Sequence, residues 1–173
     1  MRSYLKNLEC TYCNEIFSAD QPRRLCEKCG KVLYPRYDIK EASKYFTKDM
    51  LAGRAPNMWR YFEMLPVRDE SNIVTLGEGF TPIFETRRLG SELGSESLIL
   101  KDEGLNPTAS FKARGLSAAV SKAKELGLRK LTMPSAGNAA GAMASYAARA
   151  GMEAFVFMPQ DAPEANQKEV SVS

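Results

Sequence analysis

The sequence predicts an α/β protein in which a small cysteine-rich ribbon precedes a layered domain with a parallel sheet. Two observations predict this fold class, and a third bears on the membrane. All four cysteines lie in the first thirty residues, as two C-x2-C pairs. From residue 97 onwards, short apolar segments alternate with helical segments, which is the pattern of β-α-β units. No apolar run approaches the roughly 20 residues of a membrane-spanning helix, so we expect no membrane association.

The composition is that of an ordinary folded chain. Its 173 residues are 44% hydrophobic and 26% charged, which argues against disorder and against a disulfide-dense scaffold. The net charge of +3 is too small to indicate nucleic-acid binding. The absence of histidine excludes a Ser-His-Asp triad and a histidine-ligated metal. No apolar run follows the first basic residues, so we expect no secretory signal and a cytoplasmic location.

The cysteines predict a structural metal site in residues 1–38. The ligands are Cys10, Cys13, Cys26 and Cys29, with twelve residues between the two pairs. Two such turns place four thiolates around one ion at tetrahedral angles, so we expect a zinc ribbon whose closed site leaves no position for catalysis. Iron in the same sulfur cage and an empty knuckle are the alternatives. Nucleic-acid binding is the rival use of such a ribbon, but acidic residues dilute its positive charge.

The segment after the ribbon predicts a helical connector over residues 39–75. We expect a strand at 32–34, just before the connector, and two helices, at 37–53 and 57–65. Gly53 ends the first helix, and Pro56 starts the second. Trp59 lies on the apolar face of the second helix, so we interpret it as a packing anchor.

The rest of the chain, residues 76–173, predicts the layered α/β domain. The expected elements are strands at 97–101, 130–133 and 154–158, and helices at 110–126, 138–150 and 163–170. Strands joined through helices are parallel and belong to one sheet. The last helix carries no stop signal, so we expect a longer domain of which this is the first part.

Lys112 is the candidate catalytic residue. It follows a predicted strand and opens the apolar stripe of the next helix, which continues through Leu116, Ala119 or Val120, and Ala123. The positive end of a helix and partial burial both disfavour an ammonium ion, and a neutral amine can attack a carbonyl to form a Schiff base. The alternative is a lysine whose stem lies along the surface and whose amine reaches water.

A second strand-to-helix loop, formed by Ser135, Ala136, Gly137 and Asn138, is the candidate substrate-binding site. Ser135 and Asn138 offer side-chain donors, and Gly137 permits a close backbone approach. The free amides at the helix start can hold an anion such as a carboxylate. The alternative is that Ser135 or Asn138 only caps the helix.

Four strings of residues carry a resemblance to a known family. They are Gly-Glu-Gly-Phe-Thr-Pro at 77–82, Lys-Asp-Glu-Gly-Leu-Asn-Pro-Thr-Ala-Ser-Phe-Lys-Ala-Arg-Gly at 101–115, Pro-Ser-Ala-Gly-Asn-Ala-Ala-Gly at 134–141, and Phe-Met-Pro-Gln-Asp-Ala-Pro-Glu-Ala-Asn at 157–166. Over residues 5–170 the sequence resembles the threonine synthase family of fold-type II pyridoxal-phosphate enzymes. Ser-Phe-Lys and Ser-x-Gly-Asn mark only the superfamily. Asn-Pro-Thr and Gly-Glu-Gly-x-Thr-Pro narrow the resemblance to that family, some of whose members also carry the cysteine ribbon.

The resemblance implies a cofactor, a reaction and roles for the candidate residues. The fold would be a three-layer α/β/α domain with a parallel sheet, and the cofactor pyridoxal 5'-phosphate. Lys112 matches the lysine that holds the cofactor as an internal aldimine and moves protons. Asn138 matches the asparagine that binds the ring hydroxyl, and residues 135–138 match the loop that receives the substrate carboxylate. The reaction would convert O-phosphohomoserine, a small amino acid, and water to L-threonine and phosphate, and the full-length family member can form a homodimer.

Departures from the family pattern limit what the resemblance implies. The family often has Gly where this chain has Ala109 and Asp where it has Ala113. Its glycine-rich phosphate loop lies beyond residue 173, so we expect this chain alone to bind the cofactor weakly and to lack activity. The alternatives are another fold-type II enzyme (a threonine or serine dehydratase, an ammonia-lyase or a cysteate synthase) and a zinc-ribbon interaction module.

Overall fold

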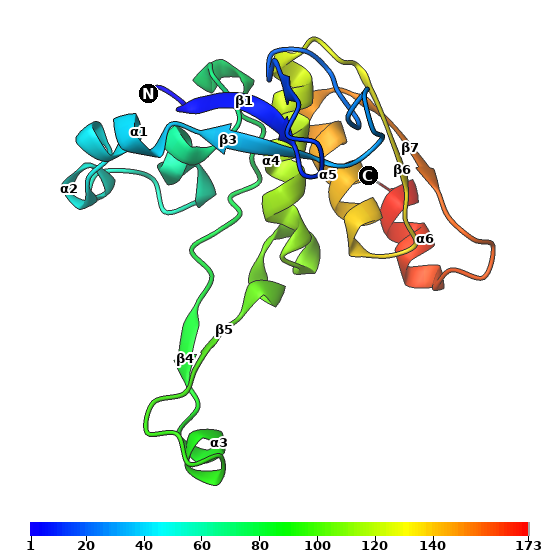
Figure 1. Ribbon diagram of the computed structural model, residues 1–173. Coiled ribbons are helices and arrows are strands. Elements are labelled where there is room, and N and C mark those ends of the chain that lie inside the picture. Colours follow the sequence, from blue (N-terminus) through cyan, green and yellow to red (C-terminus); the bar gives the residue numbers. More distant parts are fainter. Residues whose placement is uncertain (173) are drawn as a thin grey trace.

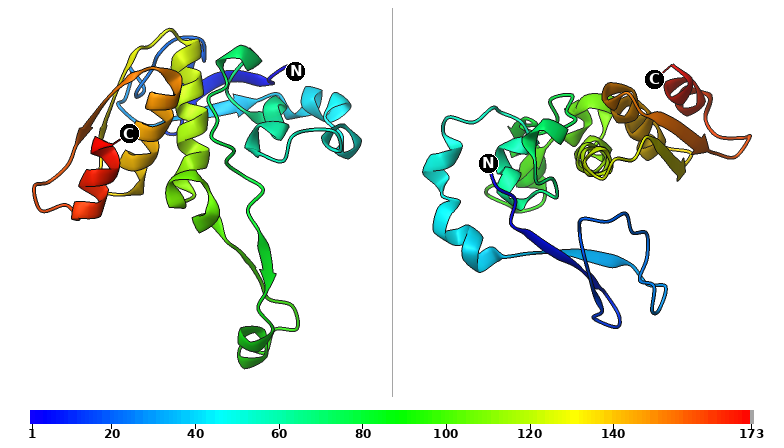
Figure 2. Two further views of the ribbon diagram at one scale, coloured as in Figure 1. Left: turned by 180° about the vertical axis from the view of Figure 1, so that it is seen from behind. Right: turned by 90° about the horizontal axis from the view of Figure 1, so that it is seen from above.

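The computed structural model describes residues 1–172 and begins with the cysteine ribbon. Its strands β1 (Leu5–Cys10), β2 (Ile16–Phe17) and β3 (Leu33–Tyr37) form an antiparallel sheet in the order β2-β1-β3. Cys10 at the end of β1 lies opposite Leu33 at the start of β3, so the sheet brings both cysteine pairs to one end. The strand predicted at 32–34 is confirmed as β3, whereas the sequence predicted no strand at the position of β1. Figure 2 shows the ribbon lying beside the rest of the chain.

The connector differs from the first predicted helix. In place of one helix over 37–53, the structure has α1 (Ile39–Tyr45) and α2 (Lys48–Leu51), so this prediction is wrong in its continuity. The chain becomes extended at Phe46. The break lets the Phe46 ring pack edge-on against the Tyr61 ring, with centroids 6.4 Å apart.

The second predicted helix, at 57–65, forms as a 3-10 helix over Met58–Met64 that is kinked at Tyr61. A turn of three residues stacks Trp59 directly above Phe62, and both side chains are buried. They form a small core with Met58 and Val67, so Trp59 packs as predicted. A short 3-10 turn, Glu70–Asn72, then leads toward the α/β body.

The α/β body follows the predicted order of elements. It consists of α4 (Lys112–Glu125), β6 (Lys130–Pro134), α5 (Asn138–Ala150), β7 (Glu153–Phe157) and α6 (Glu164–Ser171). β6 and β7 pair in parallel, and α5 is the crossover between them. α5 packs against α4, β7 and α6. Figures 1 and 2 show that α4 and α5 begin at the same end of the body, where β6 ends.

The predicted strand at 97–101 forms but does not join the parallel sheet. As β5 (Ile99–Lys101) it pairs antiparallel with β4 (Ile83–Glu85). The connection between the two strands contains α3 (Arg87–Glu92). The prediction that it shares a sheet with β6 and β7 is thus wrong within residues 1–172. A short connection favours local antiparallel pairing, whereas parallel pairing with β6 would need α4 as its crossover. The hairpin extends away from the body (Figure 1).

The core of the body lies between α4, α5 and the segment that enters from the connector. Val74, Ala113, Val120 and Tyr146 form its buried cluster, against which Leu131 of β6 packs. Small residues on α5 allow this close packing. At Gly141 a side chain would collide with the carboxyl group of a residue on α6.

Charged contacts attach the ribbon to the body. The Asp20 carboxylate accepts hydrogen bonds from Arg68 Nε at 2.5 Å and Nη2 at 3.2 Å, and lies 3.7 Å from Lys122 Nζ on α4. Arg68 also donates to the carbonyl of Leu5 at 3.0 Å. The ribbon therefore touches the helix that begins with Lys112.

Candidate functional site

The four cysteine sulfurs gather at one end of the ribbon. Sγ of Cys10 lies 3.4 Å from that of Cys29, and Sγ of Cys13 lies 3.6 Å from that of Cys26. All four lie within 4.8 Å of one another, and none forms a disulfide. A tetrahedral zinc site with bonds of about 2.3 Å separates its sulfurs by about 3.8 Å. The donor set and its dimensions therefore fit one zinc ion.

Both cysteine pairs end in the same kind of turn. The residue after each pair, Asn14 or Gly30, has a left-handed backbone, with φ of 59° and 71°. Its amide bonds back to the carbonyl of the first cysteine, from Asn14 to Cys10 at 3.3 Å and from Gly30 to Cys26 at 2.8 Å. Gly and Asn adopt this conformation at least cost. The two knuckles thus curl their thiols toward a common point.

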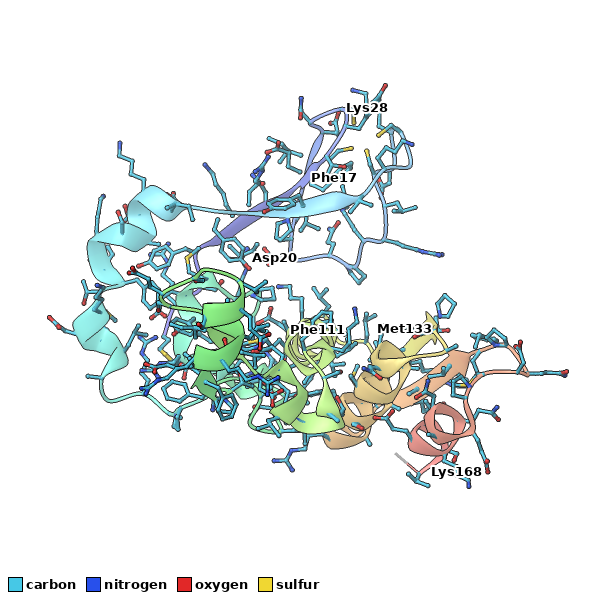
Figure 3. All side chains as sticks on the ribbon, turned by 90° about the horizontal axis from the view of Figure 1, so that it is seen from below. Phe17, Asp20, Lys28, Phe111, Met133 and Lys168 are labelled. Atoms are coloured by element: carbon cyan, nitrogen blue, oxygen red, sulfur yellow. The ribbon has the colours of Figure 1, made fainter. Side chains whose placement is uncertain are left out.

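Lys112 is the first residue of α4 and is half-buried. Its Nζ lies 4.3 Å from the centroid of the Phe111 ring. Within residues 1–172 its amine has no hydrogen bond and no ion pair, so it is free to react. Figure 3 shows the chain from below and labels Phe111, the residue just before Lys112.

The loop at residues 135–138 enters α5 without a side-chain cap. Gly137 is the N-cap residue and Asn138 the first helical residue, while Ser135 Oγ only accepts from the Gly137 amide at 3.3 Å. The alternative that Ser135 or Asn138 caps the helix is therefore wrong here. The amides of Asn138 and Ala139 have no acceptor in the described part of the chain. Two free donors at the positive end of a helix can bind a carboxylate.

The two candidate loops lie near each other. α5 packs against α4 and against the Pro107–Ala109 turn that precedes Lys112. Asn166 of α6 donates to the carbonyl of Ala136 at 2.6 Å and so fixes the second loop from outside. The helix starts that carry Lys112 and Asn138 share one end of the body (Figure 1).

The turn before Lys112 contains strained backbone. Thr108 and Ala109 have φ of 60° and 49°, a left-handed conformation that costs about 1–2 kcal/mol for a residue other than glycine. The buried hydroxyl of Thr108 has no hydrogen-bond partner among residues 1–172. Strain and an orphaned polar atom are features that collect at functional sites.

The strain at Ala109 gives a first prediction. Ala109→Gly removes the Cβ that opposes this backbone, so we expect the free energy of unfolding to rise by about 1 kcal/mol. Urea denaturation measures the change. In the matched control, Ala119→Gly at an exposed helical position of α4, the same substitution lowers stability by about 0.5–1 kcal/mol. Loss of stability in both variants would contradict the assignment of strain to Ala109.

A second polar cluster lies beside this turn. Arg114 binds the Glu103 carboxylate with two bonds, of 2.6 and 2.8 Å, and Thr81 and Asn106 donate to it at 2.6 and 2.9 Å. The hydrogen bonds from Arg114 lower the pKa of Glu103 to about 2. Thr81, Glu103 and Arg114 line a cavity of about 680 Å³ together with Lys101 and several apolar side chains. Lys112 is not among its lining residues.

Glu78 is the buried site residue that the sequence analysis did not single out. It appeared there only inside the string at 77–82, yet its side chain is fully buried beside α4 and α5. The available signal was a charged residue between two glycines, Gly77 and Gly79, followed by Thr-Pro. A charged residue in so tight a turn is held by specific partners.

Comparisons with known proteins show the family of the chain. The model of the family described as "Pyridoxal-phosphate dependent enzyme" matches residues 74–171, more than half of the chain. Threonine synthase of Methanocaldococcus jannaschii is 40% identical over 151 residues, which are 87% of this chain and 37% of that protein. Threonine synthase of Methanosarcina acetivorans is 38% identical over 153 residues, 88% of this chain and 37% of that protein. Threonine synthase of Halalkalibacterium halodurans is 45% identical over 109 residues, 60% of this chain and 30% of that protein.

The chain therefore spans about 37% of the length of the first two relatives. With 151 and 153 residues aligned, the similarity to these two proteins extends beyond residues 74–171. Within the described residues, no helix is long and apolar enough to cross a membrane.

Proposed function

Because the chain belongs to the pyridoxal-phosphate-dependent enzyme family, we propose that it carries the lysine-bearing part of a threonine synthase. The reaction is the conversion of O-phosphohomoserine and water to L-threonine and phosphate. Relatives with that name, at 38–45% identity, support the proposal. The observation that carries it is the unpaired amine of Lys112, which begins α4 at the end of the body where α5 also begins.

The candidate residues fit the cofactor in chemistry and placement. When bound, pyridoxal phosphate supplies an aldehyde for the Lys112 amine and a ring that accepts electrons from the substrate. Lys112 would hold the cofactor through Nζ, and the same amine, once released, would be placed to move a proton to or from the substrate carbon. Asn138 offers an exposed amide side chain to the ring hydroxyl. The free amides at the start of α5 bind the substrate carboxylate, with Ser135 beside them.

The cysteine cluster has a structural role in the same proposal. One zinc ion is held by Cys10, Cys13, Cys26 and Cys29. Four protein ligands leave it no open position, so it stabilises the ribbon and takes no part in the chemistry.

Reductive capture tests the role of Lys112. The chain is incubated with pyridoxal phosphate, reduced with borohydride and digested, and the modified lysines are identified by mass spectrometry. Reduction makes even a weak, reversible imine permanent. We expect capture to concentrate on Lys112 and to disappear in Lys112→Ala, because its amine is half-buried and unpaired whereas most other lysines have ion-pair partners or are solvated.

Lys130→Ala is the matched control, because Lys130 also lies over a phenylalanine ring, with Nζ 5.9 Å from the Phe155 centroid. It should leave capture at Lys112 unchanged. Capture spread evenly over the exposed lysines would contradict the proposal. Phosphate release from O-phosphohomoserine, compared with turnover of threonine, serine and O-phosphoserine by the full-length, cofactor-loaded protein, separates a threonine synthase from a dehydratase.

A further inference from the structure

Glu78 is a buried carboxylate that forms no salt bridge with any of the described residues, although the Arg114 guanidinium is near enough to interact with it electrostatically. Its side chain is fully buried, and every hydrogen bond that it accepts comes from a neutral group. The other buried glutamate, Glu63, differs, because Arg54 binds both of its oxygens at 2.7 Å. A charge buried without a counterion is costly unless several donors satisfy it. The hydrogen-bond donors around Glu78 therefore stabilise its buried charge.

The donors to Glu78 come from segments far apart in the sequence. They are Trp59 Nε1 at 3.0 Å, Ser117 Oγ at 2.6 Å, Tyr146 OH at 2.5 Å, Thr75 Oγ1 at 3.1 Å and the Leu76 amide at 3.0 Å. The two shortest bonds come from Ser117 on α4 and from Tyr146 on α5. Bonds to an ionised acceptor are shorter and stronger than neutral ones. One carboxylate thus bridges the two helices.

The electrostatics agree with an ionised Glu78. Burial alone would raise the pKa of its carboxyl, but the hydrogen bonds from Ser117 and Tyr146 outweigh burial and hold that pKa below its usual value. For the phenol of Tyr146, burial and the neighbouring Glu78 carboxylate both raise the pKa, so it remains a proton donor.

The loop that carries Glu78 is itself fixed in place. Gly77 and Gly79 have φ of 92° and 100°, and a Cβ on Gly79 would lie 2.6 Å from the backbone nitrogen of Met58. The Met58 amide donates to the carbonyl of Glu78 at 2.7 Å, and the Gly79 amide donates to Asn106 Oδ1 at 3.0 Å. The turn that carries the carboxylate is therefore anchored to Met58 and Asn106, outside both helices.

We propose that Glu78 is a positioning residue that fixes α4 against α5 and so holds Lys112 in place relative to the start of α5. Ser117 lies five residues after Lys112, about 7.5 Å along α4, and Tyr146 lies eight residues after Asn138, about 12 Å along α5. Both anchor points are within a few turns of the candidate loops. The hydrogen bonds alone support the role of Glu78 in positioning the two helices. The importance of that role for catalysis rests on the proposed function.

Hydrogen exchange tests the positioning without any cofactor. The readout is amide exchange in the second turns of α4 and α5, the first turns whose amides are hydrogen-bonded within the helix. Glu78→Gln keeps the shape of the side chain but replaces the anion with a group that also donates. We expect exchange in both turns to rise about tenfold, together with an about tenfold loss of cofactor capture at Lys112.

Glu63→Gln is the matched control, since it alters a buried glutamate whose side-chain hydrogen bonds come from Arg54 and not from α4 or α5. Both variants are compared at denaturant concentrations that give equal global stability. The proposal predicts that only Glu78→Gln speeds exchange in the two helix starts. Equal effects of the two variants would overturn it, because Glu78 would then contribute only general stability.

Two milder variants keep the test decisive if Glu78→Gln does not fold. Tyr146→Phe removes the donor on α5, and Ser117→Ala removes the donor on α4. If Glu78 bridges the helices, Tyr146→Phe speeds exchange at the start of α4, and Ser117→Ala speeds exchange at the start of α5. Effects confined to the mutated helix would overturn the proposal. Absence of capture at Lys112 in the unmodified chain would instead count against the proposed function, while the exchange data still decide the role of Glu78.

Discussion

Removal of zinc from the proposed four-cysteine site is expected to unfold the ribbon and to leave the α/β body folded. The ribbon buries few apolar side chains, chiefly Tyr4, Leu5 and Ala19 together with the ligands Cys10 and Cys26. So small a core is not expected to hold three short strands together, and metal binding would supply most of the stability, about 10–16 kcal/mol in comparable zinc modules. The body keeps its own core between α4 and α5. We expect a chelator, or Cys10→Ser, to abolish exchange protection in β1 and β3.

The measurement is zinc content, expected at one ion per chain, combined with exchange before and after chelation. Asp20→Asn is the control, because it weakens the contact with Arg68 and Lys122 without touching a ligand. This variant should keep its zinc and the protection of β1 while the ribbon separates more readily from α4. Full protection of β1 and β3 in the metal-free chain would contradict a structural metal site.

The parts of the fold that the sequence predicted well are those with a local physical signature. The C-x2-C pairs require no tertiary information, because each knuckle is closed by its own turn. The helix predicted at 138–150 forms with those bounds as α5, since its small residues and its terminal Gly151 define it locally. The strands at 130–133 and 154–158 shift by at most one residue at either end in β6 and β7. The α/β class and the pyridoxal-phosphate family followed from these elements and from the strings around them.

What the sequence did not reveal depends on contacts between distant segments. The partner of β5 is β4, and nothing in residues 97–101 distinguishes antiparallel from parallel pairing. The break at Phe46 depends on Tyr61, which comes much later in the chain. Glu78 in turn depends on donors up to 68 residues away. A buried polar bridge leaves no periodic pattern, because each member contributes a single atom.

Truncation of Arg54 should give the largest loss of stability outside the metal centre. Arg54 and Glu63 are mostly buried, with side chains 14% and 6% exposed, and Arg54 also donates to the carbonyl of Arg60 at 2.6 Å. Arg54→Ala leaves the Glu63 carboxylate buried without its counterion, so we expect the free energy of unfolding to fall by about 3–5 kcal/mol at neutral pH. Urea denaturation measures this loss. Arg88→Ala, which breaks the exposed pair with Glu92, is the control and should have no measurable effect.

The pH dependence of that loss identifies its cause. In the unmodified chain the hydrogen bond from Arg54 holds the pKa of Glu63 below its ordinary value. This depressed pKa contributes stability that is present above the pKa of the unfolded chain and is lost as the pH falls through the folded pKa. In Arg54→Ala we expect burial to raise the pKa of the unpaired carboxyl instead. Protonation at low pH then removes the buried charge and its cost to stability. The difference in free energy of unfolding between the two proteins must therefore become smaller as the pH falls. A difference that stays constant with pH would show that lost packing, and not the unpaired charge, destabilises the variant.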